Sequence, residues 1–403
     1  MLINVIGLGY IGLPTALALA AHGLKVVGTD YNEKLVQTLQ SGKTTFEEKD
    51  LDKIFKQALD NCIQFKTEYQ EADVYIISVP TPYEKENKRI DPTYVVNALK
   101  SVLKICPEEA IVVIESTISP GTIDRFVCPI VKKQNKKVHL VHAPERILPG
   151  NMIYELKHNS RTIGADDVKI GEKVKEVYAS FCEADIVVTD IRTAEMTKVV
   201  ENTFRDINIA FANELTKICH SGHMDVYEII RIANKHPRVN ILQPGPGVGG
   251  HCISVDPWFL VGDYPLLTNL ILQARKINDG MPEFVLSRIA EIMKENRISD
   301  LSKVGFYGLT YKEDVDDMRE SPTLQILDSM EKHLATGVRV YDPFIKENIV
   351  ENQEQNLKNF LDKVDMVVVL VGHTEIKDNL ELLKDKIVLD TRGICKNPGV
   401  YRL

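Results

Sequence analysis

The first hydrophobic pattern along the chain is a short apolar run at residues 2–6, which is followed by glycines and then by an Ala/Leu-rich stretch at residues 15–22. A short apolar run bounded by glycines is typical of a buried strand, and the stretch after it has helical composition. Further strand-like runs lie at residues 25–29, 74–79, 110–115, 138–142 and 185–189. Strands that alternate with helices favour a parallel, doubly wound sheet. We therefore expect a Rossmann-like first domain over residues 1–190.

The pattern changes after this domain. Residues 193–236 have a long helical period, and residues 264–296 predict another long helix despite Gly280 and Pro282. Residues 237–263, between these helices, are rich in glycine and proline, which indicates a functional loop. We expect a central helical domain over residues 191–296.

Strand and helix patterns alternate again in the last part of the chain. The strand candidates are residues 304–307, 338–341, 366–371 and 387–389. They predict a second, smaller Rossmann-like domain over residues 297–403. The expected fold class is thus α/β, with two Rossmann-like doubly wound domains joined by a central helical domain.

Composition excludes several classes of function. With 403 residues, 44% hydrophobic content and scattered basic residues at a net charge of −8, the chain is expected to be a multidomain globular protein that does not bind nucleic acid. No apolar run reaches the roughly 20 residues of a membrane span, and no basic segment precedes the first apolar run. We expect a cytoplasmic protein with no membrane partner. Its seven cysteines are dispersed without a C-x-x-C pair, so neither a metal site nor a disulfide framework is expected.

Gly7, Gly9 and Gly12 form a G-x-G-x-x-G motif directly after the first strand. Such glycines allow a tight turn and the close approach of a pyrophosphate to a helix N-terminus. Asp30 ends the second strand about 20 residues further on, where a carboxylate accepts hydrogen bonds from ribose hydroxyls and repels a 2′-phosphate. The motif predicts NAD as the cofactor; the alternative is a glycine-rich turn without a ligand.

Two other strand ends carry polar turns, and Thr81 and Thr117 lie in them. Ligands of doubly wound sheets bind outside the carboxyl ends of the strands, so both hydroxyls are candidates for contact with the cofactor. Each threonine equally suits a turn or helix cap.

The candidate chemistry lies in the glycine-rich segment that contains Cys252, with Asp256 four residues later. Glycines let backbone approach a ligand, and a thiolate is a strong nucleophile when nearby donors or cations lower its pKa. An inert buried thiol is the alternative interpretation. Lys198, Asn202 and Arg205 have the spacing of one helical face, which also fits a solvated polar stripe. Glu145 follows another strand and offers a carboxylate at the cofactor edge of the sheet, or a partner for a nearby base.

Seven ordered motifs resemble those of the UDP-glucose/GDP-mannose dehydrogenase family across essentially the whole chain. They are GLGYIGLP, VPTP, ESTISPGT, APER, EMTKVVENTFR, GPGVGGHCISVDP and GLTYKEDVDDMRESP. Within the family, the segment HPRVNILQPGPGVGGHCISVDPWFLV is most similar to members that oxidise UDP-N-acetylmannosamine in bacterial surface-polysaccharide pathways. Members that act on UDP-glucose typically carry a lysine where this chain has Val255, and this departure argues against glucose.

The resemblance implies a role for individual residues. It implies Cys252 as nucleophile, Lys198 as general acid/base, Asn202 at the reacting oxygen, and Asp256 with Glu145 in handling water. The implied cofactor residues are Gly7, Gly9, Tyr10, Ile11, Gly12, Asp30, Lys34, Thr81, Thr117 and Arg319. The implied substrate residues are Arg146, Ile147, Lys198, Asn202, Arg205, His236, Arg238, Gly249, Tyr311 and Lys312. In a homodimer, His236 and Arg238 would serve the substrate of the neighbouring subunit.

These roles imply oxidation of a UDP-sugar at C6 to a uronic acid with two NAD. Lys198, or a water that it positions, takes the proton of the alcohol during the first hydride transfer, and Cys252 captures the aldehyde as a thiohemiacetal. A second hydride transfer leaves a thioester, which is hydrolysed. UDP-N-acetylglucosamine and UDP-glucose remain alternative substrates. A two-electron β-hydroxyacid-type dehydrogenase and a nucleotide-sensing scaffold that has lost its chemistry remain alternative functions.

Overall fold

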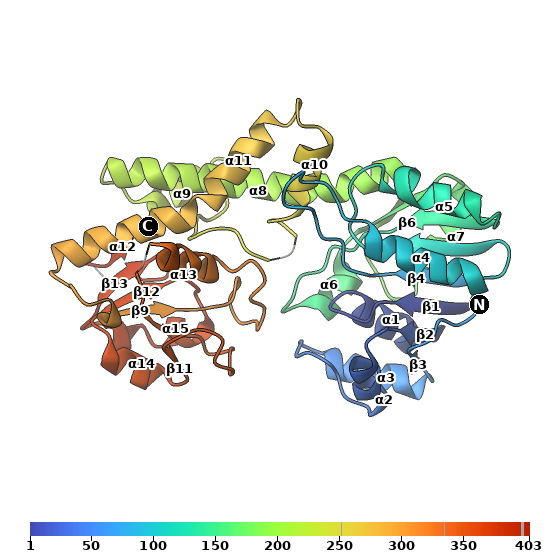
Figure 1. Ribbon diagram of the computed structural model, residues 1–403, viewed down its shortest axis with the longest axis horizontal. Helices are drawn as coiled ribbons and strands as arrows, with labels where there is room; N and C mark the ends of the chain where they lie inside the picture. Colours follow the sequence, from blue (N-terminus) through green and yellow to red (C-terminus); the bar gives the residue numbers. More distant parts are fainter. Residues whose placement is uncertain (251, 334, 396–398) are drawn as a thin grey trace. The chain divides into compact units, whose positions relative to one another are not determined.

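The computed structural model describes residues 1–250, 252–333, 335–395 and 399–403. These residues form two compact units, residues 1–201 and residues 202–403. Figure 1 labels the helices and strands of each unit.

The first unit contains one sheet with the strand order β3-β2-β1-β4-β5-β6-β7-β8. Neighbouring strands are parallel, except that β7 is antiparallel to β6. The strands are β1 (Leu2–Ile6), β2 (Lys25–Thr29), β3 (Gln64–Lys66), β4 (Val74–Ile77), β5 (Ala110–Ile114), β6 (Val138–His142), β7 (Arg161–Ala165) and β8 (Ile186–Thr189). The helices are α1 (Gly12–Ala21), α2 (Glu33–Gln40), α3 (Leu51–Asp60), α4 (Thr93–Ile105), the π-helix η1 (Ile123–Val127), α5 (Cys128–Lys133), α6 (Met152–His158) and α7 (Val168–Ala179).

Alternating side chains divide the core of the first unit between the two faces of its sheet. Ile3 and Val5 of β1 and their neighbours on one face pack with apolar residues of α1, α3, α6 and α7. Helix α4 contacts β4 and buries Val95 and Leu99. Because helices cover the sheet, most of its strands are short apolar runs, and those strands were recognisable in the sequence.

The long helix α8 (Ile191–Ser221) completes the first unit up to Glu201 and begins the second at Asn202. The second unit also has one parallel sheet, with the order β11-β10-β9-β12-β13-β14. Its strands are β9 (Val304–Tyr307), β10 (Arg339–Tyr341), β11 (Gln353–Glu354), β12 (Met366–Val369), β13 (Ile387–Asp390) and β14 (Tyr401–Arg402). Its remaining helices are α9 (Val226–Ala233), α10 (Asp256–Asp263), α11 (Asn269–Asp279), α12 (Met281–Glu295), η2 (Leu301–Lys303), α13 (Pro322–Lys332), α14 (Leu357–Lys363), α15 (Thr374–Asp378) and η3 (Leu380–Leu383).

The second sheet is also buried on both faces. Val304 and Phe306 of β9 belong to a core that contains apolar residues of α12 and α13. Tyr307 belongs to a separate core with Phe360 of α14 and Ile376 of α15. Strand side chains that alternate with a period of two residues pack in these cores against helix side chains that recur with a period of 3.6 residues.

The expected α/β class with two parallel sheets and a helical middle section is confirmed. The expected single helix over residues 264–296 is wrong, because α11 ends at Asp279 and α12 begins at Met281. The expected loop over residues 237–263 is wrong at its end, since α10 starts at Asp256. Four strands, β3, β7, β11 and β14, were not predicted. Over the described residues, no helix combines the length and apolar character that a membrane crossing requires.

Candidate functional site

The glycine loop after β1 is closed by backbone contacts that leave no room for side chains at two of its three glycines. A Cβ at Gly7, whose φ is +88°, would lie 2.3 Å from Ser78 O, and one at Gly12 would lie 1.8 Å from Gly7 O. Around a Cβ at Gly9, by contrast, the described residues place no atom within 4 Å. The loop is therefore tight toward the sheet and open at Gly9, which is the shape that lets a phosphate approach the backbone.

Asp30 holds this loop in place. Its Oδ2 accepts the N–H of Leu8 at 2.8 Å and its Oδ1 accepts the N–H of Asn32 at 2.9 Å. The carboxylate is partly exposed, so its remaining lone pairs face a possible ligand. Within the described chain, α1 begins without a side-chain cap and without an acidic residue in its first turn. A helix start of this kind offers N–H groups to an anion, so the loop fits a dinucleotide pyrophosphate.

Three other predicted cofactor residues lie close to this loop in the sequence. The Tyr10 ring packs on Phe46 with 4.5 Å between centroids, and Ile11 occupies the N-cap position of α1. Lys34 is exposed in the first turn of α2.

Thr81 and Thr117 are brought together at the carboxyl ends of β4 and β5. The Thr81 hydroxyl donates to the Thr117 carbonyl at 2.7 Å, and the Ser116 hydroxyl donates to Val79 O at 2.7 Å. These bonds join the turn after β4, which lies beside β1, to the turn after β5, the next strand in the sheet. The Thr81 proton is thus already donated, so toward a ligand this hydroxyl serves as an acceptor.

Glu145 and Arg146 follow β6 but differ in their surroundings. Glu145 is buried and its carboxylate accepts the N–H of Ile147, itself buried. Arg146 makes a bidentate pair with Glu201, through Nε at 2.9 Å and Nη2 at 2.5 Å, and also donates to Ser160 O. Its guanidinium is therefore engaged inside the first unit, and a substrate role would require exchange of these partners.

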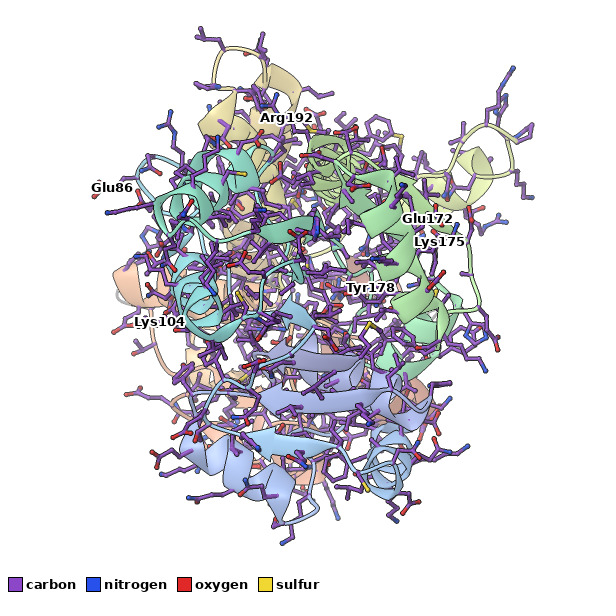
Figure 2. The ribbon with its side chains drawn as sticks, turned by 90° about the vertical axis from the view of Figure 1, so that its right-hand side faces the viewer. Glu86, Lys104, Glu172, Lys175, Tyr178 and Arg192 are labelled. Carbon is purple, nitrogen blue, oxygen red and sulfur yellow. The ribbon has the colours of Figure 1, made fainter. Side chains whose placement is uncertain are left out.

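A buried carboxylate that the sequence reasoning did not select lies at the end of β5. Glu115 Oε1 accepts the Tyr178 hydroxyl at 3.1 Å and lies 3.5 Å from Nη1 of the buried Arg161. Figure 2 labels Tyr178 on α7. Burial raises the pKa of Glu115, although the positive charge of Arg161 opposes the shift. The negative charge of Glu145 adds to the rise of the Glu115 pKa.

Glu195 of α8 was also missed. Its carboxylate accepts the N–H groups of Gly121 and Ile123, at 2.5 and 3.0 Å, and so holds the turn that contains Thr117 against α8. Burial raises its pKa to about 7, against these hydrogen bonds. In the sequence, Glu195 could have been recognised as a charged residue at a position of the predicted helix that is expected to be buried.

In the second unit, α8 and α10 join at a pair of predicted catalytic residues. Asn202 Nδ2 donates to Asp256 Oδ2 at 2.6 Å, and both side chains are buried. Lys198, one helical turn before Asn202 on α8, is buried as well. The helix thus directs a polar face inward, which does not fit the alternative of a solvated stripe.

We call residues 245–256 the cysteine loop; His251 within it lies outside the described residues. The half-buried Cys252 accepts the N–H of Asp256 through its carbonyl at 2.9 Å, so the nucleophile candidate immediately precedes α10. A Cβ at Gly249 would lie 2.6 Å from Tyr311 Cβ, and Gly250 N donates to Arg319 O at 2.8 Å. The glycines therefore let the loop pack directly on the segment after β9.

Tyr311 shares its surroundings with several predicted residues. Burial raises its pKa above the ordinary value, and the charges of Asp317 and Cys252 add to the rise, while Arg319 and Arg205 oppose it. The structure thus brings Tyr311, Cys252, Arg205 and Arg319 into one electrostatic environment. Arg319 is also bidentate to Asp317, with Nη2 to Oδ2 at 2.6 Å.

The remaining predicted residues lie on the surface or near it. His236 and Arg238 follow α9, both are exposed, and Arg238 N donates to His236 Nδ1 at 3.3 Å. Lys312 is partly exposed and its carbonyl accepts the Thr310 hydroxyl at 2.8 Å. Among the described side chains, no group of three or more His, Cys, Asp and Glu could hold a metal ion.

Family models match three consecutive parts of the chain. Residues 1–182 match the NAD binding domain of the UDP-glucose/GDP-mannose dehydrogenase family, residues 192–280 its central domain, and residues 305–397 its UDP binding domain. The chain is 44% identical to a UDP-N-acetyl-D-mannosamine dehydrogenase of Methanococcus aeolicus, over 97% of this chain and 91% of the relative.

Two solved structures are similar over the full length. The UDP-N-acetyl-mannosamine dehydrogenase of Staphylococcus aureus has a TM-score of 0.88 at 39% identity, with 100% of this chain and 98% of that chain covered. The UDP-D-ManNAc dehydrogenase of Pyrococcus horikoshii has a TM-score of 0.92 at 35% identity with the same coverage.

Proposed function

Because the chain belongs to the UDP-glucose/GDP-mannose dehydrogenase family, we propose that it oxidises the C6 hydroxyl of UDP-N-acetyl-D-mannosamine to a carboxylate, with two NAD consumed per sugar. The observation that carries the choice of sugar is the 44% identity over 97% of the chain to a relative with that name. Val255, where UDP-glucose enzymes typically have lysine, supports the same choice.

NAD would lie at the glycine loop, with its pyrophosphate at the start of α1 and a ribose at Asp30. The open space at Gly9 and the partly exposed carboxylate of Asp30 fit such a ligand. NAD would supply the acceptor for the hydride that leaves C6. Thr81, Thr117, Tyr10, Ile11 and Lys34 complete the proposed cofactor residues of the first unit, and Arg319 those of the second.

Lys198 and Asn202 act on the reacting oxygen. Lys198 lies at a buried position of α8 and carries an amine that can accept a proton, so it is the proposed general base. Lys198 takes the proton of the C6 hydroxyl, and Asn202 donates a hydrogen bond to the oxygen. Since Asn202 Nδ2 already donates to Asp256, its amide orientation is set before substrate binds.

Cys252 makes the second oxidation possible. Its thiolate adds to the aldehyde carbon and forms a thiohemiacetal, from which the second hydride leaves to give a thioester. Water then attacks the thioester carbon, the carbon–sulfur bond breaks, and the thiolate of Cys252 is restored. Asp256 and Glu145, both buried carboxylates, orient that water and take its proton.

The residues proposed to bind the nucleotide sugar are those that the family resemblance implies. They are Arg146, Ile147, Lys198, Asn202, Arg205, His236, Arg238, Gly249, Tyr311 and Lys312. The domains that carry them are residues 1–190 for NAD, 191–296 for the cysteine loop and the dimer contact, and 297–403 for the UDP moiety. The ring of Tyr311 packs against Gly250 of the cysteine loop. Since Tyr311 is also a proposed substrate residue, substrate binding is expected to affect the position of this loop.

A homodimer is part of the proposal. Phe204, Phe211 and Ile218 of α8 are 65%, 50% and 55% exposed and recur every seven residues. An apolar stripe of this period on a long helix favours packing against another helix. The partner is expected to be a second copy of this chain, with His236 and Arg238 offered to the substrate of the neighbouring subunit. Sedimentation of the wild type and of Phe211→Glu tests this: a dimer that the substitution converts to monomer is expected, and a monomeric wild type would refute it.

We also propose that the protein works in the cytoplasm. All seven cysteines are free thiols, and a thiolate nucleophile persists in a reducing compartment.

The experiment that tests the function measures NADH produced per sugar consumed, with UDP-N-acetylmannosamine, UDP-N-acetylglucosamine and UDP-glucose at equal concentration. Two NADH per UDP-N-acetylmannosamine, a product acid of the matching mass, and slower turnover of the other sugars are expected. One NADH per sugar would exclude the covalent scheme and support the two-electron alternative. Carboxylate formation at near wild-type rate by Cys252→Ala would likewise exclude Cys252 as the nucleophile.

A further inference from the structure

A buried ion pair lies between α8 and α11 in the second unit. Arg275 Nη1 donates to Asp206 Oδ1 at 2.6 Å, and the two residues are 1% and 0% exposed. The same Nη1 lies 3.5 Å from the carbonyl of Ile253, the residue after Cys252. The guanidinium carbon also lies 5.9 Å from the centre of the Trp258 ring in α10. Arg275 therefore contacts both the cysteine loop and the helix that follows it.

Hydrogen bonds extend the pair to the beginning of the cysteine loop. Asn278 Nδ2 donates to Asp206 Oδ1 at 2.8 Å and to Asp206 O at 3.0 Å. Its Oδ1 accepts Asn213 Nδ2 at 2.8 Å, and Asn213 Oδ1 accepts the N–H of Gly245 at 3.0 Å. A continuous series of buried amides thus leads from the ion pair to Gly245.

Helix α8 consequently holds the cysteine loop at three points. Asn213 binds its first residue, Asp206 binds Ile253 through Arg275, and Asn202 binds Asp256 at its end. These three α8 residues are spaced by four and seven positions, so they lie along one side of the helix. A rigid helix that fixes both ends of a glycine-rich loop sets the position of the cysteine between them.

The ion pair is poorly suited to a purely stabilising role. Within the described chain, Asp206 Oδ2 and Arg275 Nε have no hydrogen-bond partner. Burial raises the pKa of Asp206 although Arg275 and Asn278 oppose the shift. Two charges withdrawn from water with incomplete hydrogen bonding contribute little net stability relative to apolar side chains of similar size.

We propose that Asp206 and Arg275 are positioning residues for the nucleophile, which set the place of Cys252 through Ile253 and act with Asn278 and Asn213 on the whole cysteine loop. The inference rests on the proposed function of Cys252, because only a nucleophile needs its position fixed. Neither residue is a catalytic residue; both act through the loop. A displacement of about 1 Å at a reacting atom lowers a rate by roughly 100-fold, so loss of the pair is expected to affect turnover more than binding.

The test replaces both charges at once with Asp206→Leu/Arg275→Met, because removing Arg275 alone would leave the buried carboxylate of Asp206 without its cation, whereas Arg275 also pairs with Asp279. We expect kcat to fall by about 10- to 100-fold, while KM for the UDP-sugar and for NAD changes by less than about three-fold. Hydrogen exchange of peptides from residues 245–256 is expected to accelerate in the absence of substrate. The urea midpoint followed by fluorescence of Trp258 should stay close to the wild-type value.

The matched control is Arg339→Met/Glu354→Leu, which removes another ion pair of the second unit, with Nη1 to Oε1 at 2.9 Å. It should leave kcat and exchange of the cysteine loop unchanged. Wild-type kcat and wild-type exchange in Asp206→Leu/Arg275→Met would overturn the inference. Because exchange needs no substrate, it decides the inference even if the proposed activity is absent.

If the double variant does not fold, Asn213→Ser tests the same series of bonds at the Gly245 end. It removes the side-chain amide that accepts the N–H of Gly245 and donates to Asn278 Oδ1, and a several-fold lower kcat with faster exchange of residues 245–256 is expected. Wild-type values for both quantities in Asn213→Ser would then count against the inference.

Discussion

In each unit, a glycine with positive φ follows the first strand of the sheet, β1 or β9, and makes the same backbone hydrogen bond. The surroundings of the two glycines differ. In the first unit, Gly7 has φ +88° and its N–H donates to Thr29 O at 2.8 Å. In the second, Gly308 has φ +100° and its N–H donates to Tyr341 O at 2.8 Å. In both, the next residue donates its N–H to an aspartate at the end of the adjacent strand, Leu8 to Asp30 and Leu309 to Asp342.

The two aspartates differ in what else they bind. Asp30 is partly exposed and accepts the backbone N–H groups of Leu8 and Asn32, whereas Asp342 is 2% exposed. Asp342 accepts the N–H groups of Leu309 and Thr310 and lies 3.2 Å from Nε2 of the buried His373. The first carboxylate is therefore available to a ligand, and the second is occupied by the protein.

The segments between the first strand and the next helix differ in the same sense. Residues 7–11 form a short turn that leads directly into α1, while residues 308–321 form a long loop before α13. The long loop carries Tyr311 and Arg319, which contact the cysteine loop. Because α13 begins far along the chain from the end of β9, the residues between them can pack against the cysteine loop. The same backbone arrangement is thus open to a ligand in the first unit and occupied by internal packing in the second.

The largest expected effect comes from Asp342→Ala. It leaves the N–H groups of Leu309, Thr310 and Phe344 and the ring of His373 without their acceptor in a buried place. The free energy of unfolding of the second unit should fall by about 3 to 5 kcal/mol. A urea titration followed by fluorescence measures this, because the chain has one tryptophan, Trp258, and it lies in the second unit. A loss below about 1 kcal/mol would contradict the contrast between the two aspartates.

A second contrast involves the two fully buried histidines. His142 of β6 contacts Ile114 O through Nδ1 at 2.9 Å, and its Nε2 has no hydrogen-bond partner in the described structure. Burial lowers the pKa of His142 to about 4, although this hydrogen bond opposes the shift. In the second unit, burial would raise the pKa of Asp342, but the hydrogen bond and charge of His373 outweigh it and lower the pKa.

These pKa shifts predict that the two units lose stability over different ranges of acidic pH. Between pH 6.5 and 4 an unfolded His142 binds a proton that the folded one does not, so its contribution to stability is complete above pH 6.5 and is lost on acidification. At pH 4.5 the loss should be about 2 to 3 kcal/mol. The contribution of Asp342 is present above the ordinary carboxyl pKa and is lost only at lower pH.

The measurement is hydrogen exchange of peptides from β6, for the wild type and His142→Asn, at pH 7 and pH 4.5 after correction for intrinsic rates. The asparagine amide can still donate to Ile114 O but does not titrate. The stability difference between the two proteins should change with pH by the stated amount. An unchanged difference would show that His142 is not neutral in the fold.

Asp30→Ala has a smaller expected effect, and on binding more than on folding. The N–H groups of Leu8 and Asn32 that it releases lie in part-buried and exposed surroundings, where water can replace the acceptor. The KM for NAD should rise at least ten-fold, which corresponds to roughly 1.4 kcal/mol. The KM for the UDP-sugar and the urea midpoint from Trp258 should not change. An unchanged KM for NAD would mean that the ribose does not bind Asp30.

The strands that the sequence predicted are those made mainly of apolar residues, whether they are fully buried like β5 or partly exposed like β8. Ile3, Val5 and their neighbours make β1 a continuous apolar run, and the same holds for β4, β5 and β12. Strand β7 was missed because it begins with Arg161, and the partner that permits an arginine there, Glu115, is distant in the sequence. Strand β3 reads Gln-Phe-Lys, which carries no apolar alternation.

The helix prediction for residues 264–296 failed because periodicity was given more weight than Gly280 and Pro282. Proline lacks the N–H that an interior helical position donates, and it is tolerated in the first turn, where α12 has it. For the candidate site, local patterns predicted a functional cysteine loop and a polar face of α8, and these roles stay predictions. They did not identify Asp206 with Arg275, because the two residues are 69 positions apart and pair only after folding.

The smallest expected effect distinguishes a glycine that leaves room for a ligand, Gly9, from a glycine that is needed for its positive φ, Gly23. A methyl group at Gly9 enters open space in the structure, so Gly9→Ala should leave the melting temperature within about 1 °C and raise the KM for NAD about five-fold, or ~1 kcal/mol, by crowding the ligand. Gly23→Ala is the matched control. Gly23 also has open space around its Cβ, but its φ is +88°, so alanine is strained there and should cost about 1 kcal/mol of stability without changing the KM for NAD. If both variants lowered stability alone, the space at Gly9 would not be a ligand site, and the first unit would use its glycine loop only for folding, as the second unit uses Gly308.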